Sequence, residues 1–206
     1  MKSTLTARCI VLALAAMSVG QSFAQPADTG NWLVRGRALH LDSANKDSTG
    51  LNLSVNNKTF PEVDITYFFT PNLAAELVLT YPQKHDIRSG STVIGQLKHL
   101  PPSLLAQYHF TGLGGLRPYV GAGLNATFLS GVKFVPAVQT ALSPRLEKRS
   151  LGLALQLGVD VPVGGWLFNV DVKKVNLGVD VYAGATKAGD FKIDPVLFSV
   201  GLGKRF

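Results

Sequence analysis

Large apolar residues alternate with small or polar residues at the end of this chain. In residues 191–206, one face carries Val196, Phe198, Val200, Leu202 and Phe206, and the other carries mostly glycine, serine and arginine. A period of two residues predicts a β-strand. A soluble protein rarely exposes so apolar a strand, so we expect its large side chains to face lipid while neighbouring strands close a cylinder.

The same alternation recurs along the chain and predicts eight strands in total. They are expected at 31–41, 59–69, 73–81, 102–110, 117–128, 151–161, 166–179 and 191–206. Long connections at 42–58, 82–98 and 129–149 alternate with short ones at 70–72, 112–116 and 163–165, and a further loop is expected at 182–190. Short periplasmic turns and long external loops are typical of outer-membrane barrels. The sequence therefore predicts an all-β fold, an eight-stranded antiparallel transmembrane β-barrel of the bacterial outer membrane, with both chain ends on the periplasmic side.

The alternation within 166–179 changes phase part-way. The outward apolar positions end at Val172, and apolar residues resume at Val175 after Lys173 and Lys174. An extra residue in one strand shifts the phase of the side chains in this way. We interpret the shift as a β-bulge.

The first 24 residues have the pattern of a secretory signal peptide. Lys2 and Arg8 form a basic start, residues 9–17 are uncharged and mostly apolar, and cleavage is expected after Ala24. The expected domains are therefore a signal peptide at 1–24 and a barrel at 25–206. Cleavage removes the single cysteine, Cys9, and leaves 18 of the 20 Lys and Arg residues against 13 Asp and Glu. For an exported chain this basic balance favours anionic lipid headgroups as partners, and no nucleic acid is expected.

Five aromatic residues support the predicted orientation. They all fall on the apolar face, next to the short turns or the chain ends: Trp32, Phe69, Phe110, Trp166 and Phe206. Aromatic residues gather at membrane interfaces, although they are also common in strands generally. We expect these five to form a periplasmic aromatic girdle.

The predicted inner face is strongly charged. Its charged residues are Arg35, Arg37, Glu62, Asp64, Glu76, Asp160, Asp171, Lys173 and Arg205. An eight-stranded barrel is only just wide enough to be filled by its own side chains, and unpaired buried charges are costly. We expect these residues to form an ionic plug; the alternative is an ion-selective pore lining.

Several segments resemble the OmpW family of small outer-membrane proteins, which includes AlkL-type proteins. The matching segments are AEL at 75–77, PQKHD at 82–86, LPPS at 100–103, RPYVGAGLN at 117–125, and the ending at 194–206. The resemblance covers nearly all of the expected mature chain. It implies an eight-stranded barrel concerned with the passage of small hydrophobic molecules across the outer membrane.

A charged plug would stop a hydrophobic molecule from crossing the lumen, so we expect it to enter among the external loops and leave sideways through the wall. The candidate hydrophobic entrance is Leu39, Phe134, Val135 and Leu197; ordinary rim packing is the alternative for each. The candidate lateral seam, between the third and fourth strands, is Pro82, Pro101 and Pro102, because proline lacks the N–H that a ladder needs. Strand termination is the alternative for these prolines.

No catalytic motif, metal site or cofactor site is expected. The histidines have no paired metal spacing, and the glycines at 121 and 123 are not followed by a predicted helix. The expected partners are outer-membrane lipid and lipopolysaccharide, a small hydrophobic ligand and the outer-membrane assembly machinery. Two other functions remain open: a structural or surface-interaction protein, serving envelope integrity, adhesion or as a phage or bacteriocin receptor, and a narrow ion channel.

Overall fold

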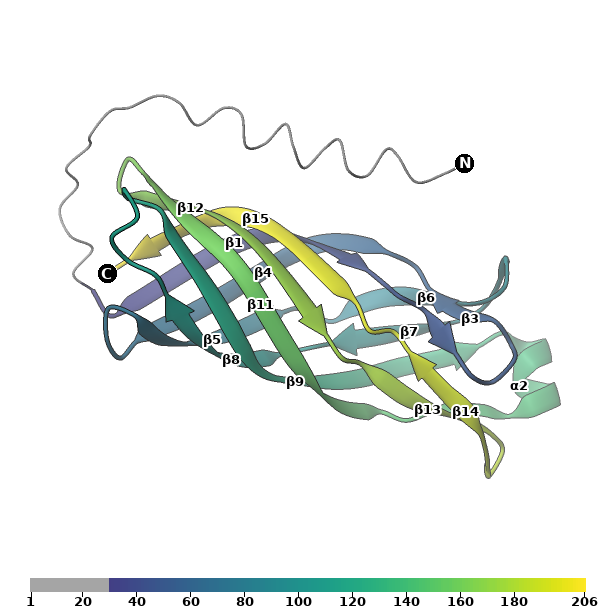
Figure 1. The fold of residues 1–206 in the computed structure, drawn as a ribbon. Helices are drawn as coiled ribbons and strands as arrows, with labels where there is room; N and C mark the ends of the chain where they lie inside the picture. Colours follow the sequence, from purple (N-terminus) through teal and green to yellow (C-terminus); the bar gives the residue numbers. More distant parts are fainter. Residues whose placement is uncertain (1–29) are drawn as a thin grey trace, which may run out of the picture.

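Eight antiparallel strands close into a barrel in the computed structural model, which describes residues 30–206 (Figure 1). The expected signal peptide lies outside the described residues. The wall strands are β1 (Trp32–Asp42), β4 (Lys58–Phe68), β5 (Leu73–Thr80), β8 (Ser103–His109), β9 (Arg117–Phe134), β11 (Arg149–Val163), β12 (Trp166–Val175) and β15 (Val196–Arg205). Each pairs with the next in this order, and β15 returns to pair with β1. The predicted eight-stranded barrel is therefore confirmed.

The short turns β4–β5, β8–β9 and β11–β12 lie at one end of the barrel, together with the C-terminus (Figure 1). We call this the turn end and the opposite one the loop end. Gly164 and Gly165 connect β11 to β12 with φ values of 55° and 82°, a left-handed conformation that glycine adopts without steric cost. At the same end, Trp32 and Phe206 exchange two backbone hydrogen bonds and so close the ring.

The outer wall of the barrel is apolar. Leu151, Leu153, Leu155 and Leu157 follow one another at every second position of β11, and each is more than 60% exposed. The phase of the wall strands matches the sequence prediction, except after Lys173 in β12, where Val175 points inwards. An exposed apolar surface that continues around a closed barrel fits a lipid environment.

The structure places the five predicted girdle residues at the turn end. All of them are exposed: Trp32, Phe69, Phe110, Trp166 and Phe206. Tyr67 joins two of them, with its ring centroid 4.8 Å from that of Trp32 and 5.1 Å from that of Phe69.

The segments expected as long loops instead continue the barrel as a folded extension. This loop-end extension contains β2 (Lys46–Asp47), β3 (Leu53–Val55), β6 (Gln83–Ser89), β7 (Thr92–Leu100), α2 (Pro136–Leu142), β10 (Pro144–Leu146), β13 (Gly178–Ala183) and β14 (Thr186–Lys192), with the last part of β9 (Figure 1). Their short apolar alternations are masked in the sequence by Asn, Ser, Lys and Gly. Within residues 30–206, no helix has the length and apolar composition needed to cross a membrane.

The bulge expected at Lys173 and Lys174 is wrong. β12 keeps one continuous register with β11 from Trp166 to Val175 and with β15 from Leu167 to Lys174. The change of phase has another cause. In the barrel wall the apolar side chains point outwards, whereas in the loop-end extension they point inwards and form a buried core that includes Val175, Leu177 and Val179.

Deleting Phe206 is expected to impair barrel assembly. The residue supplies an exposed ring to the turn end and both backbone hydrogen bonds to Trp32, so its loss shortens the β1–β15 ladder at that end. Heat-modifiable gel migration of membrane fractions measures the folded yield, and Phe198→Leu, which keeps an apolar outward residue on the same strand, is the control. A normal yield from the truncated chain would contradict the expectation.

Candidate functional site

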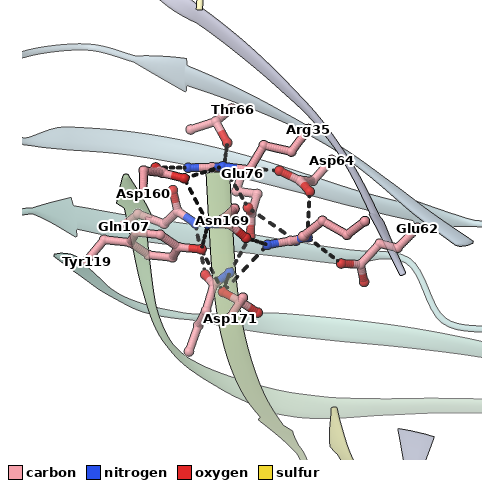
Figure 2. Close-up of polar contacts among 12 residues, drawn as sticks. Arg35, Glu62, Asp64, Thr66, Glu76, Gln107, Tyr119, Asp160, Asn169 and Asp171 are labelled. Atoms are coloured by element: carbon pink, nitrogen blue, oxygen red, sulfur yellow. Dashed lines mark hydrogen bonds and ion pairs between the residues drawn. The ribbon is translucent and has the colours of Figure 1, made fainter. Parts of the chain in front are cut away.

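Arg35 on β1 is the centre of a buried ionic network in the barrel lumen (Figure 2). Its guanidinium contacts Asp160 at 2.6 Å, Asp64 at 3.0 Å and Glu76 at 3.3 Å, and it also donates to Thr66 Oγ1 at 3.0 Å. The three carboxylates come from β11, β4 and β5. One side chain therefore joins four strands across the lumen.

Arg37 and Lys173 extend this network toward the loop end. Arg37 Nε lies 2.8 Å from both Glu62 Oε1 and Asp64 Oδ2. Lys173 Nζ lies 2.8 Å from Asp171 Oδ1 and 3.2 Å from Glu62 Oε1. The charged side chains are at most 2% exposed, so each relies on these partners in place of water.

The structure brings together eight of the nine residues expected in the plug, and Arg205 lies apart. Its Nε donates to the carbonyl of Gly30 at 2.7 Å, and its guanidinium carbon lies 3.8 Å from the Phe68 ring centroid. Arg205 lines a vestibule of about 620 Å³ at the turn end, with Asp160 at its inner side. It is the last residue of β15, so although its phase is inward it lies at the rim.

Neutral polar residues complete the ionic network, and they are not among the residues predicted for the plug. Tyr119 donates to Asp171 at 2.7 Å, and Gln156 donates to both Glu76 and Asp171 at 2.8 Å. Other members are Thr66, Gln107 and Asn169 (Figure 2). Their inward phase could have predicted them, because they are polar residues at buried positions of transmembrane strands.

Glycine provides the space for this network. A Cβ atom on Gly158 would lie 2.3 Å from the ring of Tyr119, and one on Gly203 would lie 2.7 Å from Cγ of Arg35. The lumen is thus filled by large polar side chains of some strands packed against bare backbone of others. Such filling is expected for an eight-stranded barrel, which is only just wide enough to hold its own side chains.

Above the ionic network, the interior becomes apolar and contains three small cavities in series. The lowest, about 20 Å³, has Glu62 and Lys173 at its floor and Leu39 and Leu197 in its wall. Leu41 and His99 also line the next cavity, of about 10 Å³. Leu97 lines both this middle cavity and an outer cavity of about 40 Å³. We call this series the apolar path.

The four candidate entrance residues are distributed along this path. Leu39 and Leu197 line its inner end. Phe134 lines the outer cavity, where Leu51 and Leu142 are also exposed to solvent. Val135 is 38% exposed and precedes helix α2, but it does not line the cavity.

The candidate seam lies beside the inner end of the apolar path. Pairing between β5 and β8 runs from Leu73–Tyr108 to Val78–Ser103. Beyond it, the carbonyls of Pro101 and Pro102 accept hydrogen bonds from Asn125 Nδ2 at 3.2 and 3.3 Å. These bonds connect Pro101 and Pro102 to β9. Pro82, which is exposed, lies on the other side of the interruption in strand pairing.

Two histidines of the loop-end extension face the apolar path. The ring centroids of His85 and His99 are 5.7 Å apart, and His85 Nδ1 lies 3.1 Å from the carbonyl oxygen of Asn56. Burial lowers the pKa of His85, with Lys58 adding to the effect and Asp86 opposing it. Burial also lowers the pKa of His99 to about 3, so both rings are uncharged at neutral pH.

The matching family model is that of the OmpW family, and it covers residues 28–206. This chain belongs to the OmpW family. It is 33% identical to outer membrane protein W of Vibrio cholerae, over the full length of both chains. The crystal structure of OprG from Pseudomonas aeruginosa matches with a TM-score of 0.74 and 26% identity, covering 86% of this chain and 96% of that one. The expected outer-membrane location is thereby confirmed.

The name of a further relative refers to a metabolic operon. It is the dibenzothiophene metabolism operon protein PahQ of Pseudomonas aeruginosa, 29% identical over 55% of this chain and 53% of that protein.

Replacing Arg35 in this OmpW-family barrel is expected to destabilise it strongly. Arg35→Leu leaves Asp64, Glu76 and Asp160 without their shared cation, and breaking a buried pair costs about 3–5 kcal/mol. Urea unfolding in detergent or lipid measures the loss. The control is Lys187→Ala, which removes ion pairs to Asp180 and Asp190 on the exposed β13–β14 hairpin and should change the midpoint little. Equal effects of the two variants would contradict this view of the network.

Acid is expected to loosen the loop-end extension before the barrel wall. Unfolded histidine binds its proton near pH 6.5, whereas His99 in the fold does so only near pH 3. Falling pH therefore favours the unfolded form across this window, by about 1.4 kcal/mol per pH unit for each such histidine. Hydrogen exchange of β6 and β7 at pH 7.5 and pH 5, with β12 as internal reference, measures it. In His99→Leu the pH dependence should weaken; an unchanged dependence would contradict the assignment.

Proposed function

We propose that this barrel admits small hydrophobic molecules passively at its loop end and releases them sideways into the membrane. One observation carries the proposal: the apolar path ends on a floor of Glu62 and Lys173. A hydrophobic molecule cannot replace the ion pairs below that floor without leaving buried charges unpaired, which costs several kcal/mol. A sideways exit avoids this cost.

The seam between β5 and β8 is the proposed exit. Pro101 lines the lowest cavity of the apolar path, and Pro82 lies across the gap in the ladder. Opening the wall here breaks no β5–β8 pair, because that pairing ends at Val78–Ser103 and the β6–β7 pairing begins only at Gln83–His99. The small present volume of the cavities means that the path must widen as a molecule passes.

The proposed orientation puts the loop end outside the cell and the turn end in the periplasm. Basic residues gather on the loop-end extension, where phosphate groups of outer-leaflet lipopolysaccharide are available. They are Lys84, Arg88, Lys98, Lys133, Arg145, Lys148 and Arg149. Lys84 and Lys98 are direct cross-strand partners, and a bound phosphate would relieve their mutual repulsion.

The dibenzothiophene operon relative supports the proposed class of solute, since dibenzothiophene is an uncharged, sparingly soluble aromatic compound. The two other functions make different demands. An ion channel needs a water-filled lumen, which conflicts with the paired and filled layer around Arg35 and Arg37. A purely structural role leaves the apolar path unused.

A disulfide across the seam is expected to stop uptake and leave the fold intact. The test pairs Pro82→Cys with Pro101→Cys and follows uptake of a labelled hydrophobic compound before and after reduction, in cells with and without the protein. The matched control pairs Leu73→Cys with Tyr108→Cys, which are direct partners at the other end of the same two strands.

Uptake should fall to the level of cells lacking the protein only in the oxidised seam variant, and reduction should restore it. Unchanged uptake with a verified seam disulfide would exclude the lateral route. A steady ion current from the purified barrel in a planar bilayer would favour the channel instead.

A further inference from the structure

Three buried polar atoms along one side of the apolar path have no hydrogen-bond partner among residues 30–206. They are Oγ1 of Thr80, Oε1 of Gln83 and Nε2 of His85. Gln83 is fully buried and His85 is 2% exposed. We call these three atoms the acceptor ladder, because they follow one another along the β5–β6 segment.

The neighbours of each group define its chemistry. Gln83 Nε2 donates to the carbonyl of Tyr81 at 3.1 Å, so the free atom of this amide is the oxygen, which only accepts. His85 Nδ1 faces the carbonyl of Asn56 at 3.1 Å and must carry the ring proton. Nε2 of the neutral ring is then an unprotonated acceptor. The Thr80 hydroxyl can accept as well as donate.

Two members of the ladder line the inner path, and the third lies between them in the chain. His85 lines the middle cavity, and Thr80 lines the lowest one. Gln83 lies between them as the direct cross-strand partner of His99, whose ring lines both cavities. Pro82, at the proposed exit, is adjacent to Gln83 in the chain.

A buried acceptor without a partner is costly, and a donor that reaches it recovers the loss. An anion would be repelled by these lone pairs. A cation would lose its hydration among Leu41, Val55 and Leu97, which line the middle cavity with no carboxylate beside them. The group that fits is an uncharged hydroxyl carried on an apolar body.

We propose that the acceptor ladder selects hydrophobic molecules bearing a hydroxyl group, such as medium-chain alcohols and phenols, over hydrocarbons of equal size. This inference rests on the proposed function, because it assigns a preference to the same path. The hydroxyl passes from His85 to Gln83 to Thr80 as the apolar body moves toward the seam.

The test compares uptake of labelled 1-octanol and labelled octane by cells expressing the full-length protein, each corrected for cells that lack it. The variants Gln83→Met and Thr80→Val remove acceptors with little change in volume. Each should lower the octanol-to-octane uptake ratio by about two- to tenfold, the range of one hydrogen bond. The control is Ser199→Ala: its hydroxyl is also buried and unpartnered, but it lies on β15, opposite Leu39 and Asp171, and not on the β5–β6 segment.

The outcomes separate the two proposals. If neither compound enters faster in expressing cells, the proposed function fails. Both compounds could instead enter, with an octanol-to-octane uptake ratio that is unchanged in the ladder variants or changes equally in the control. In that case the ladder does not select solutes, and water alone supplies its hydrogen bonds.

A second measurement needs no variant. The ¹⁵N resonance of His85 Nε2 in the purified protein should shift on titration with octanol and stay in place with octane. Identical responses to the two compounds would overturn the inference.

Discussion

Arg35 cannot reach water, so it must find all its counter-charge inside the barrel. Asp64, Glu76 and Asp160 supply it from three other strands. Because each of these carboxylates depends on the same guanidinium, the register around the closed barrel is coupled to one side chain. Bare backbone at Gly158 and Gly203 gives the large polar groups their space. A filled, charged lumen is the result, and the proposed lateral route avoids it.

The polarity of the wall strands reverses along their length. At membrane height the outside is apolar and the inside is charged, whereas in the loop-end extension the inside is apolar, with Leu97 and Leu177 in its core. The reversal takes place between Lys173, which belongs to the ionic network, and Val175, which belongs to the apolar core. The inner end of the apolar path therefore lies directly against the charged network and beside the candidate seam. The proposed lateral exit and the acceptor ladder both follow from this junction.

Much of the candidate site could be anticipated from inward phase alone. Alternation placed Arg35, Glu62 and Lys173 on the inner face, and the structure brings them into one network. Alternation also placed Arg205 on the inner face, although this residue lies at the rim of the barrel. A period of two gives the face of a residue but not its height in the barrel. Tyr119 and Gln156 are uncharged, so the charge pattern of the inner face does not reveal them, although a buried hydroxyl or amide also needs partners.

The strand phase, the lipid-facing surface and the number of wall strands follow from local alternation, since each depends on neighbours two positions apart in the chain. Which residues meet across the lumen depends on the folded barrel, because Arg35 and Asp160 become partners through the register of a closed sheet. The tertiary structure also decided that the long polar connections fold into an extension with an apolar interior. Short strands there are stabilised by contacts with distant segments, as between β7 and β9, and local alternation in Asn- and Lys-rich stretches is too weak to reveal such contacts.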